Sequence, residues 1–297
     1  MDDDLRAGLA ALAADAESGA SEILPRALEL LRTARAQGEE ATLETARAIG
    51  DAQPSMASCW NAAAAALLDR EQPGALERFE QRARRSGHAL TRVAAGALLA
   101  GDPRPTHFTT FSFSGSVLAA LRAVAEVSPI VVACAEGRPR LEGQRMASAL
   151  AAAGIPVAFH TDAALAVSLP DTDALVVGAD AVTPHWFVNK AGTGPLAAAA
   201  SWMGVPVFVL ATREKFLPAA LTRLLDFVSH DPTEVWAPAP AGVSISNPYF
   251  ERVPLDLVTA IVTDAGVLGV DMVEEACRSA GTGITEEIVA ELATPTV

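Results

Sequence analysis

Small polar residues stand at the end of the first short apolar run in the second half of this chain. Ser112 lies near the end of that run, and Ser114 and Gly115 follow directly ahead of a helical stretch. Backbone N–H groups at such a strand-to-helix turn can point at an anion, and the positive end of the helix adds to the attraction. The turn therefore predicts an anion site. An ordinary helix N-cap is the alternative interpretation.

An arginine follows the second apolar run. Arg138 precedes Pro139, and a residue before proline is biased toward an extended backbone. This places a guanidinium beyond a strand end, where it suits two-pronged recognition of a phosphate or a carboxylate. A surface ion pair with Glu136 or Glu142 is the alternative, and the local sequence supports both.

A carboxylate ends the fourth apolar run. Asp180 comes directly after Val176–Ala179, so its carboxyl group is expected to be partly desolvated. Desolvation raises the pKa of a carboxylic acid and suits it to general acid–base work. The alternative role for Asp180 is to cap the loop that follows.

A second helix start lies a few residues further on. Thr193 is a good N-cap residue and Pro195 fits the first helical turn, so this start is also suited to bind an anion. It contains one of the chain's two lysines, Lys190; the other is Lys215. The residues expected to bind a ligand here are Asn189, Lys190, Gly192 and Thr193.

The chain as a whole is acidic. Lys and Arg number 22 against 36 Asp and Glu, which gives a formal net charge of −14 at pH 7. This charge excludes bulk binding to nucleic acid or to anionic lipid. An anionic ligand must therefore meet a locally positive pocket, which we expect the two helix starts, Arg138 and Lys190 to form around Asp180.

The sequence indicates no membrane span, secretory signal or metal site. No apolar run approaches the ~18 residues of a transmembrane helix, and the N-terminus is acidic where a secretory signal is basic. The cysteines, Cys59, Cys134 and Cys277, lack the paired spacing of a zinc site. We expect a cytoplasmic protein with no metal and no cofactor.

Two patterns of elements must position the candidate residues. From Leu5 to about Ala100, apolar residues recur at spacings of three, four and seven, which predicts four or five helices. After the Gly101–Pro105 linker, short apolar runs alternate with helical stretches, which predicts a parallel sheet with helices on both faces. We expect an α/β protein with an N-terminal helical domain over residues 1–103 and a Rossmann-like ligand-binding domain over residues 104–297. The expected strands are His107–Phe113, Pro129–Ala135, Pro156–His160, Ala174–Gly178 and Val205–Ala211, with Asp226–Val228 as a further candidate.

Four segments in the second half occur in a recognisable order: GRPRLEGQRMASALAAAGIPV, VVGADAV, FVNKAGTGPLAAAA and SNPYFERVPLDLVTAIVTDAGVL. In these segments the chain resembles the family that joins the alpha, beta and delta subunits of translation initiation factor 2B with methylthioribose-1-phosphate isomerase and ribose-1,5-bisphosphate isomerase. The resemblance implies a helical domain, a Rossmann-like domain and a homodimer formed through the C-terminal domain. For the isomerases it also implies a catalytic cysteine after the first strand and a catalytic aspartate, which is Asp180 here. The pair opens an aldose-1-phosphate ring and moves a proton between C2 and C1.

Two positions depart from the isomerases. Their Thr-His-Cys pattern falls on Thr110-Phe111-Ser112, and a serine hydroxyl is a far weaker acid than a thiol of ordinary pKa ~8.5. Ser112 therefore cannot inherit the role of a thiolate. Gln53 stands where the isomerases carry an arginine that helps to hold phosphate. Cys134, at the end of the second strand, could face the same pocket, although a small buried strand residue is the favoured interpretation.

Three hypotheses follow. The first is an initiation-factor-2B-like protein that binds a sugar phosphate or nucleotide monophosphate, with isomerase chemistry absent or altered. The phosphorylated ligand would be held by Arg138, Asn189, Lys190, Thr193 and the Ser112–Gly115 turn, and Asp180 would contact its hydroxyls. The second is an active aldose-1-phosphate isomerase in which Asp180 acts with Ser112 or Cys134. The third is a protein-binding regulatory subunit without catalysis.

Overall fold

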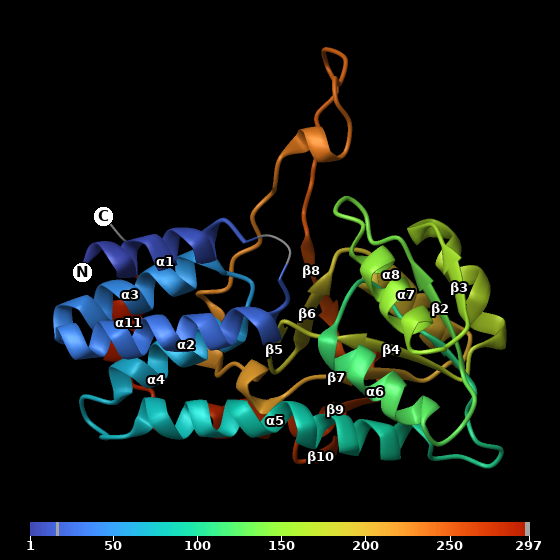
Figure 1. The fold of residues 1–297 in the computed structure, drawn as a ribbon, viewed down its shortest axis with the longest axis horizontal. Coiled ribbons are helices and arrows are strands. Elements are labelled where there is room, and N and C mark those ends of the chain that lie inside the picture. The colour runs from blue at the N-terminus through green and yellow to red at the C-terminus, as the bar shows by residue number, and fades with distance from the viewer. Residues whose placement is uncertain (16–17, 295–297) are drawn as a thin grey trace.

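The first part of the molecule is a layer of helices (Figure 1). The computed structural model describes residues 1–15 and 18–294. The helix α4 is buried along its whole length and packs against α2, α3 and α5, which its run of alanines allows to approach closely. The first five helices are α1 (Asp3–Ala13), α2 (Ala20–Gln37), α3 (Glu39–Ala52), α4 (Ala57–Leu68) and α5 (Ala75–Leu98).

A seven-stranded sheet forms the other part of the molecule. Its strand order is β10-β9-β7-β4-β1-β2-β3, and every neighbouring pair is parallel except β9 with β10. The expected, mostly parallel sheet is thus confirmed. Each of the expected runs contains a strand except Asp226–Val228, which is loop. The strands are β1 (His107–Thr109), β2 (Val131–Ala135), β3 (Val157–His160), β4 (Ala174–Gly178), β7 (Val207–Leu210), β9 (Ala260–Thr263) and β10 (Gly266–Leu268).

Helices cover both faces of this sheet. One core joins the sheet to α6 (Gly115–Ala125), α7 (Glu142–Ala152) and the second half of α5. The other core joins it to α8 (Thr193–Trp202), the 3-10 segment η1 (Asp162–Asp171) and α10 (Val273–Ala280). Because both faces are covered, the central strand β4 is buried at every residue.

The end of the chain returns to the first helices. The helix α11 (Glu286–Leu292) packs against α3 and α4, and its residues Ile288, Val289 and Leu292 belong to the helical core. A division between residues 103 and 104 stays a prediction. The helical layer itself includes a segment from well beyond that point.

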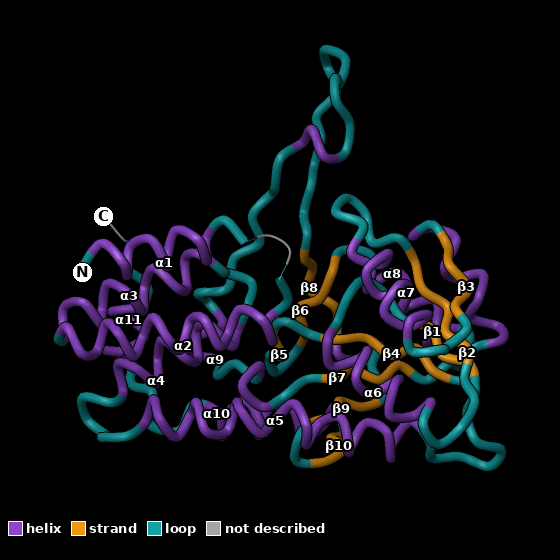
Figure 2. The backbone as a smooth tube through the Cα atoms, viewed as in Figure 1, coloured by secondary structure: helices purple, strands orange, loops and turns teal. Residues whose placement is uncertain are grey.

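A small antiparallel sheet lies between the helices and the large sheet. It has the order β5-β6-β8, formed by β5 (Ala181–Val182), β6 (Trp186–Lys190) and β8 (Phe250–Pro254). Ahead of β8 the chain extends away from the body as an arm over residues 226–249, seen at the top of Figures 1 and 2. The sequence pattern did not predict this sheet because its strands are short and because β6 pairs with β8 across a long stretch of sequence.

Tight packing at the start of α7 fixes this helix against the sheet. A Cβ atom on Gly143 would lie 1.6 Å from the carbonyl oxygen of Ala135, which is backbone and cannot move aside. We therefore expect Gly143→Ala to lower the free energy of unfolding by about 3 kcal/mol, as measured by urea denaturation. Gly87→Ala on α5, where no atom lies within 4 Å, is the control and should be neutral or stabilising. Equal stabilities of the two variants would contradict the prediction.

Candidate functional site

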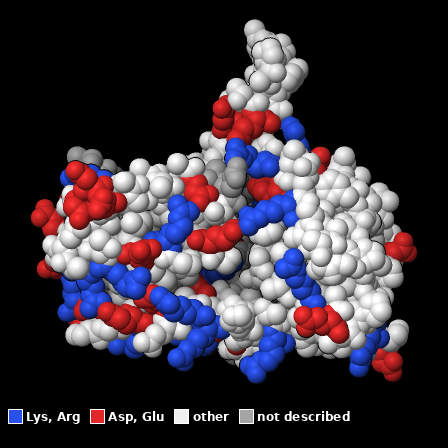
Figure 3. Space-filling view, viewed as in Figure 1, with Lys and Arg blue, Asp and Glu red and all other residues white. Residues whose placement is uncertain are grey.

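A cleft of about 270 Å³ lies where the helices, the small sheet and the end of β4 meet. Basic and acidic side chains stand next to one another on this side of the molecule, between its two parts (Figure 3). Four of the predicted residues line the cleft: Ser112, Asp180, Asn189 and Lys190. The structure thus brings together residues from three separate loops and strands of the chain.

Asp180 lies between β4 and β5 at the inner end of the cleft. Its backbone N–H donates to the carbonyl of Val188 (2.8 Å), and its carbonyl accepts from the N–H of Ala57 at the start of α4 (3.0 Å). Burial raises the pKa of the Asp180 carboxyl group, while the positive charges of Lys215 and Lys190 oppose that shift. Asp180 is therefore a carboxyl group whose proton is held more tightly than in water.

Lys215 is a residue of this site that the strand-end reasoning missed. It is buried, and its Nζ donates to the carbonyl of Ala179 (2.6 Å), the residue directly before Asp180. Both lysines of the chain therefore act on the same carboxyl group. Their rarity in the sequence was the signal that could have found Lys215.

Lys190 forms a buried ion pair with Glu142. The Nζ of Lys190 donates to Oε1 of Glu142 (2.7 Å) and lies 4.8 Å from the centre of the Tyr249 ring. Glu142 Oε2 is buried and has no hydrogen-bond partner among the described residues. The sequence suggested Glu142 only as a partner for Arg138. The pair with Lys190 instead gives it a place in the cleft.

Ser112 has a strained backbone. Its φ is 64°, and among the described residues only Leu141 shares a left-handed conformation without being glycine. Such conformations cost free energy and are concentrated at functional sites. The buried hydroxyl of nearby Thr110 also has no hydrogen-bond partner in the described structure. The turn after β1 is thus held in a costly geometry that presents Ser112 at the cleft.

The neighbours of Ser112 face elsewhere. Ser114 Oγ accepts from the N–H of Val117 (3.4 Å), so Ser114 is the N-cap of α6. Gly115 lies beside Ser21, whose Oγ would be 3.3 Å from an added Cβ. Neither residue lines the cleft. At this position the structure fits the N-cap interpretation of Ser114.

The start of α8 already has an anion, which comes from the protein itself. Oε1 of Glu251 accepts from the N–H of Gly192 (2.7 Å) and of Gly194 (2.8 Å). Thr193 Oγ1 donates to the carbonyl of Lys190 (2.6 Å) and accepts from Nδ2 of Asn189 (3.0 Å). Gly192 and Thr193 therefore lie outside the cleft and orient the two residues that line it.

Arg138 points toward the 3-10 turn η3 (Pro232–Glu234) of the arm. Its Nη2 donates to the carbonyls of Glu234 (3.5 Å) and Val235 (3.4 Å), and its N–H donates to Asp162 Oδ2 (2.7 Å). The guanidinium is exposed and does not line the cleft. Neither of the two carboxylates suggested by the sequence is its partner.

The described residues of the cleft carry more negative than positive charge. The expectation of a locally positive pocket was therefore wrong. Among the residues that the structure describes, Lys190 is the one Lys or Arg that lines it, against five carboxylates. The reason is that the arginine expected there turns away, while the N-terminal helices and the arm contribute acidic residues. The carboxylates are Asp15, Asp51, Glu142, Asp180 and Asp226.

Comparison with known proteins now identifies the family. The sequence pattern of the Initiation factor 2 subunit family matches residues 16–269. The chain belongs to this family. It is 31% identical over 272 residues to a ribose 1,5-bisphosphate isomerase of Haloferax volcanii, a match that covers 84% of this chain and 83% of that protein.

Other relatives match over shorter lengths. A methylthioribose-1-phosphate isomerase of Exiguobacterium sibiricum is 37% identical over 163 residues, which is 52% of this chain and 47% of that protein. The chain thus spans about half the length of this relative. Among solved structures, a translation initiation factor eIF-2B of Pyrococcus horikoshii has a TM-score of 0.77 at 25% identity, covering 90% of this chain and 98% of that one. The methylthioribose 1-phosphate isomerase of the same organism shares the fold, with a TM-score of 0.67 and 19% identity over 94% of this chain and 87% of that one.

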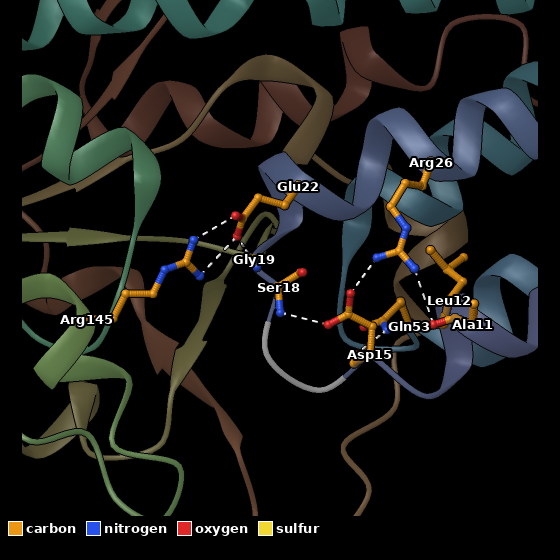
Figure 4. Close-up of polar contacts among 9 residues, drawn as sticks. All are labelled: Ala11, Leu12, Asp15, Ser18, Gly19, Glu22, Arg26, Gln53 and Arg145. Atoms are coloured by element: carbon orange, nitrogen blue, oxygen red, sulfur yellow. Dashed lines mark hydrogen bonds and ion pairs between the residues drawn. The ribbon is translucent and has the colours of Figure 1, made fainter. Parts of the chain in front are cut away.

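Gln53, where the resemblance to the isomerases implies an arginine, joins the rim of the cleft to α1 (Figure 4). Its Nε2 donates to the carbonyls of Leu12 (2.9 Å) and Asp15 (3.0 Å). The Asp15 carboxylate pairs with Arg26 and accepts from the N–H of Ser18. Gln53 is therefore occupied in holding the end of α1, and it brings no charge to the cleft.

An ion pair joins the two parts of the molecule beside this rim. Nη2 of Arg145 on α7 donates to Oε1 of Glu22 on α2 (2.7 Å), and the Arg145 guanidinium lies 3.8 Å from the centre of the Phe113 ring. Figure 4 shows these two side chains meeting between the helices. Both are about half exposed, so they help to align the parts without contributing much stability.

None of the cysteines replaces the thiol of the isomerases. All three are buried and free, and none lines the cleft. Burial raises the pKa of Cys59 to about 12, of Cys134 to about 11 and of Cys277 to about 12. Each is therefore an uncharged thiol at neutral pH. Cys134 fits the interpretation as a small buried strand residue.

The described residues hold no group of three or more His, Cys, Asp or Glu that could bind a metal ion. No helix in the described ranges is both long and apolar enough to cross a membrane.

The raised pKa of Asp180 predicts a pH dependence of stability. Above the ordinary value of 3.8, the unfolded chain loses this proton first, so the native state binds more protons until its own, higher pKa is passed. Stability falls with rising pH wherever the native state binds more protons. We expect the free energy of unfolding of the wild type, minus that of Asp180→Asn, to decrease as pH rises above about 4. Urea denaturation at several pH values measures this difference. The exposed Asp271→Asn is the control, and parallel curves for wild type and Asp180→Asn would refute the prediction.

Proposed function

We propose that this chain binds a small phosphorylated ligand, a sugar phosphate or a nucleotide monophosphate, in the cleft around Asp180, and that thiol-based isomerase chemistry is absent. The observation that carries the proposal is that Asp180, Lys190 and the strained Ser112 line one cleft, while the charge of Lys215 acts on the same Asp180 carboxyl group. A family whose members include sugar-phosphate isomerases supports the class of ligand.

The ligand would be held by two kinds of group. Ser55 and Met56 line the cleft directly ahead of α4, and the positive end of this helix together with Lys190 would attract the phosphate. The carboxylates of the cleft are hydrogen-bond acceptors, so they suit a ligand rich in hydroxyl groups. Asp180 and Asn189 would contact those hydroxyls. In this proposal Ser114, Gly115 and Arg138 make no contact with the ligand.

An active aldose-phosphate isomerase is the second candidate, and the raised pKa of Asp180 favours it. A carboxyl group that holds its proton more tightly than an ordinary aspartate suits proton transfer between C2 and C1 of a sugar. Ser112 lines the same cleft and would donate a hydrogen bond to the substrate oxygen. This candidate requires turnover by the wild-type chain.

A thermal-shift panel tests the first candidate. Ribose-1,5-bisphosphate, methylthioribose-1-phosphate and nucleoside monophosphates are compared with unphosphorylated ribose. A ligand at 100 times its Kd stabilises the native state by about 2.7 kcal/mol, which raises the Tm. The shift should be absent in Asp180→Asn and retained in Asp271→Asn. A panel without any shift would reject the proposal and favour a protein-binding role. NMR detection of a ketose product that disappears in Asp180→Asn would establish the second candidate instead.

We further propose that a homodimer forms through an apolar surface patch, consisting of Phe159, Val167, Trp202 and Met203. Their exposed fractions are 47%, 74%, 85% and 42%. They lie on β3, η1 and α8, which contact one another as β3 with η1 and η1 with α8. Apolar patches of this kind mark contact surfaces.

Trp202→Glu should therefore convert the dimer to a monomer, since a buried unpaired charge opposes association. Size-exclusion chromatography with light scattering measures the mass. Trp236→Glu, which alters the exposed tryptophan of the arm, is the control and should remain dimeric. A monomeric wild type, or a dimeric Trp202→Glu, would contradict the assignment.

A further inference from the structure

A second cavity, of about 370 Å³, is separate from the cleft. The two share no lining residue. It is enclosed by α4, α5, α10 and the 3-10 turn η2 (Arg213–Lys215). Leu68, Phe79 and Phe216 give it an apolar wall. Its volume is within the range of small-molecule sites, about 300–1,000 Å³.

The charge of this cavity is opposite to that of the cleft. Three arginines line it, Arg78, Arg82 and Arg213, against the carboxylates of Glu214 and Asp264. Asp264 is already paired with Arg213 (2.8 Å). The remaining two arginines form no ion pair within the described part of the chain: Arg78 donates to the carbonyl of Pro73 (2.9 Å), and Arg82 lies 5.8 Å from the centre of the Phe79 ring. The rim is thus positive in an acidic protein.

A buried acceptor in the cavity lacks a donor. Asn61 lines it and is 7% exposed. Its Nδ2 donates to the carbonyls of Glu214 and Phe216, both at 2.9 Å, and these two acceptors fix which side of the amide is the oxygen. Oδ1 is buried and has no hydrogen-bond partner among the described residues. A buried polar group without a partner is costly, so a ligand that donates here would gain affinity.

We propose that this cavity is a second ligand site, for a small organic anion that has an apolar body and a hydrogen-bond donor. The anionic group lies at Arg78 and Arg82, whose guanidinium groups suit a carboxylate or a phosphate. The apolar body lies against Leu68 and Phe79. The donor reaches Oδ1 of Asn61 at the inner end.

The site is connected to the cleft through η2. Glu214 and Phe216 line the cavity, while Lys215, between them, extends to the carbonyl of Ala179 beside Asp180. The amide of Asn61 binds the carbonyls on both sides of Lys215. A ligand on Asn61 therefore changes the affinity of the cleft for its own ligand. This coupling rests on the proposed function of the cleft, whereas binding in the cavity does not.

Isothermal titration calorimetry tests the site with matched probes. These are 4-hydroxybenzoate, 4-hydroxyphenyl phosphate, benzoate, which lacks the phenolic donor, and 4-hydroxybenzyl alcohol, which lacks the charge. One of the two anionic phenols should bind. The probe that binds shows whether the site takes a carboxylate or a phosphate. Benzoate and the alcohol should bind about 10-fold more weakly or not at all, because each loses one contact.

Variants locate the binding. Arg78→Met/Arg82→Met should weaken binding of the anionic phenol about 10-fold or more, and Arg85→Met, on the exposed side of the same helix, should not. Absence of binding by both anionic phenols, equal affinity for the alcohol, or an unchanged double variant would each overturn the site.

A second titration tests the coupling. The phosphorylated ligand that shifts the Tm of the wild type is titrated with and without saturating phenol. The phenol is then titrated with and without that ligand. The two affinities should change by the same factor. Equal affinities would overturn the coupling alone. Binding of the phenol without any thermal shift by the sugar phosphates or the nucleoside monophosphates would overturn the cleft proposal and leave the cavity site standing.

Discussion

Replacing Lys190 with methionine is expected to lower the free energy of unfolding by about 3–5 kcal/mol, because it removes one partner of a buried ion pair. Nζ of Lys190 lies 2.7 Å from Oε1 of Glu142, and the two side chains are only 4% and 19% exposed. Glu142 Oε2 already has no partner among the described residues. The variant would remove the lysine from Oε1 as well, which leaves a buried carboxylate without its counter-ion. Urea denaturation at neutral pH measures the loss.

Two further variants separate this effect from the loss of a long side chain. Lys190→Met/Glu142→Gln removes both charges and should recover part of the stability, since a neutral amide is far less costly to bury. Arg145→Met breaks the exposed pair with Glu22, in which the side chains are 48% and 43% exposed, and should cost at most about 1 kcal/mol. A Lys190→Met variant as stable as Arg145→Met would show that the buried pair does not stabilise the fold.

The residues of the cleft that sequence reasoning found are those that follow strands. Asp180 and Ser112 come after apolar runs, and the carboxyl ends of parallel strands meet at one edge of a sheet. A pattern local in sequence was therefore enough to bring them together. Asn189 and Lys190 were found for a different reason, as part of the helix start at α8, although the structure places them at the end of β6.

Other contributions to the cleft depend on pairings that no local pattern contains. Glu251 reaches the start of α8 from β8, across almost sixty residues of sequence, and fills the anion position that the N-cap pattern predicted. Glu142 reaches Lys190 from another helix. In the small sheet that carries these contacts, β6 pairs with its neighbour β5 and also with β8, which is far away in sequence. Periodicity within a window cannot predict such pairing.

The charge of the cleft was mispredicted because the strand ends, from which it was inferred, form only one side of the cleft. Strand ends supplied the cations, whereas Asp15 and Asp51 come from the helical layer and Asp226 from the base of the arm. The linker at Gly101–Pro105 suggested a separate helical domain. Instead the helices close the cleft, and α11 returns to pack on them.

Ser112→Cys is expected to give the chain an isomerase activity that the wild type lacks. The new thiol would lie in the same cleft as Asp180 and Lys190, at the position of the cysteine that the resemblance to the isomerases implies. A thiol of ordinary pKa ~8.5 is ionised to a few per cent at pH 7, whereas a serine hydroxyl stays protonated. Incubation with methylthioribose-1-phosphate or ribose-1,5-bisphosphate, followed by NMR, measures formation of the ketose.

Asp180→Asn in the Ser112→Cys background should reduce this turnover by about 10²–10⁴-fold, the usual contribution of a positioned general acid or base. The reason is that the amide keeps the shape of Asp180 but cannot exchange its proton with the substrate. Ser114→Cys is the matched control for the thiol: it places a cysteine two residues away, at the N-cap of α6 and outside the cleft, and should remain inactive. Equal ketose formation by the wild type and Ser112→Cys would show that the serine does not limit the chemistry. Activity retained in the double variant would remove Asp180 from the proton transfer.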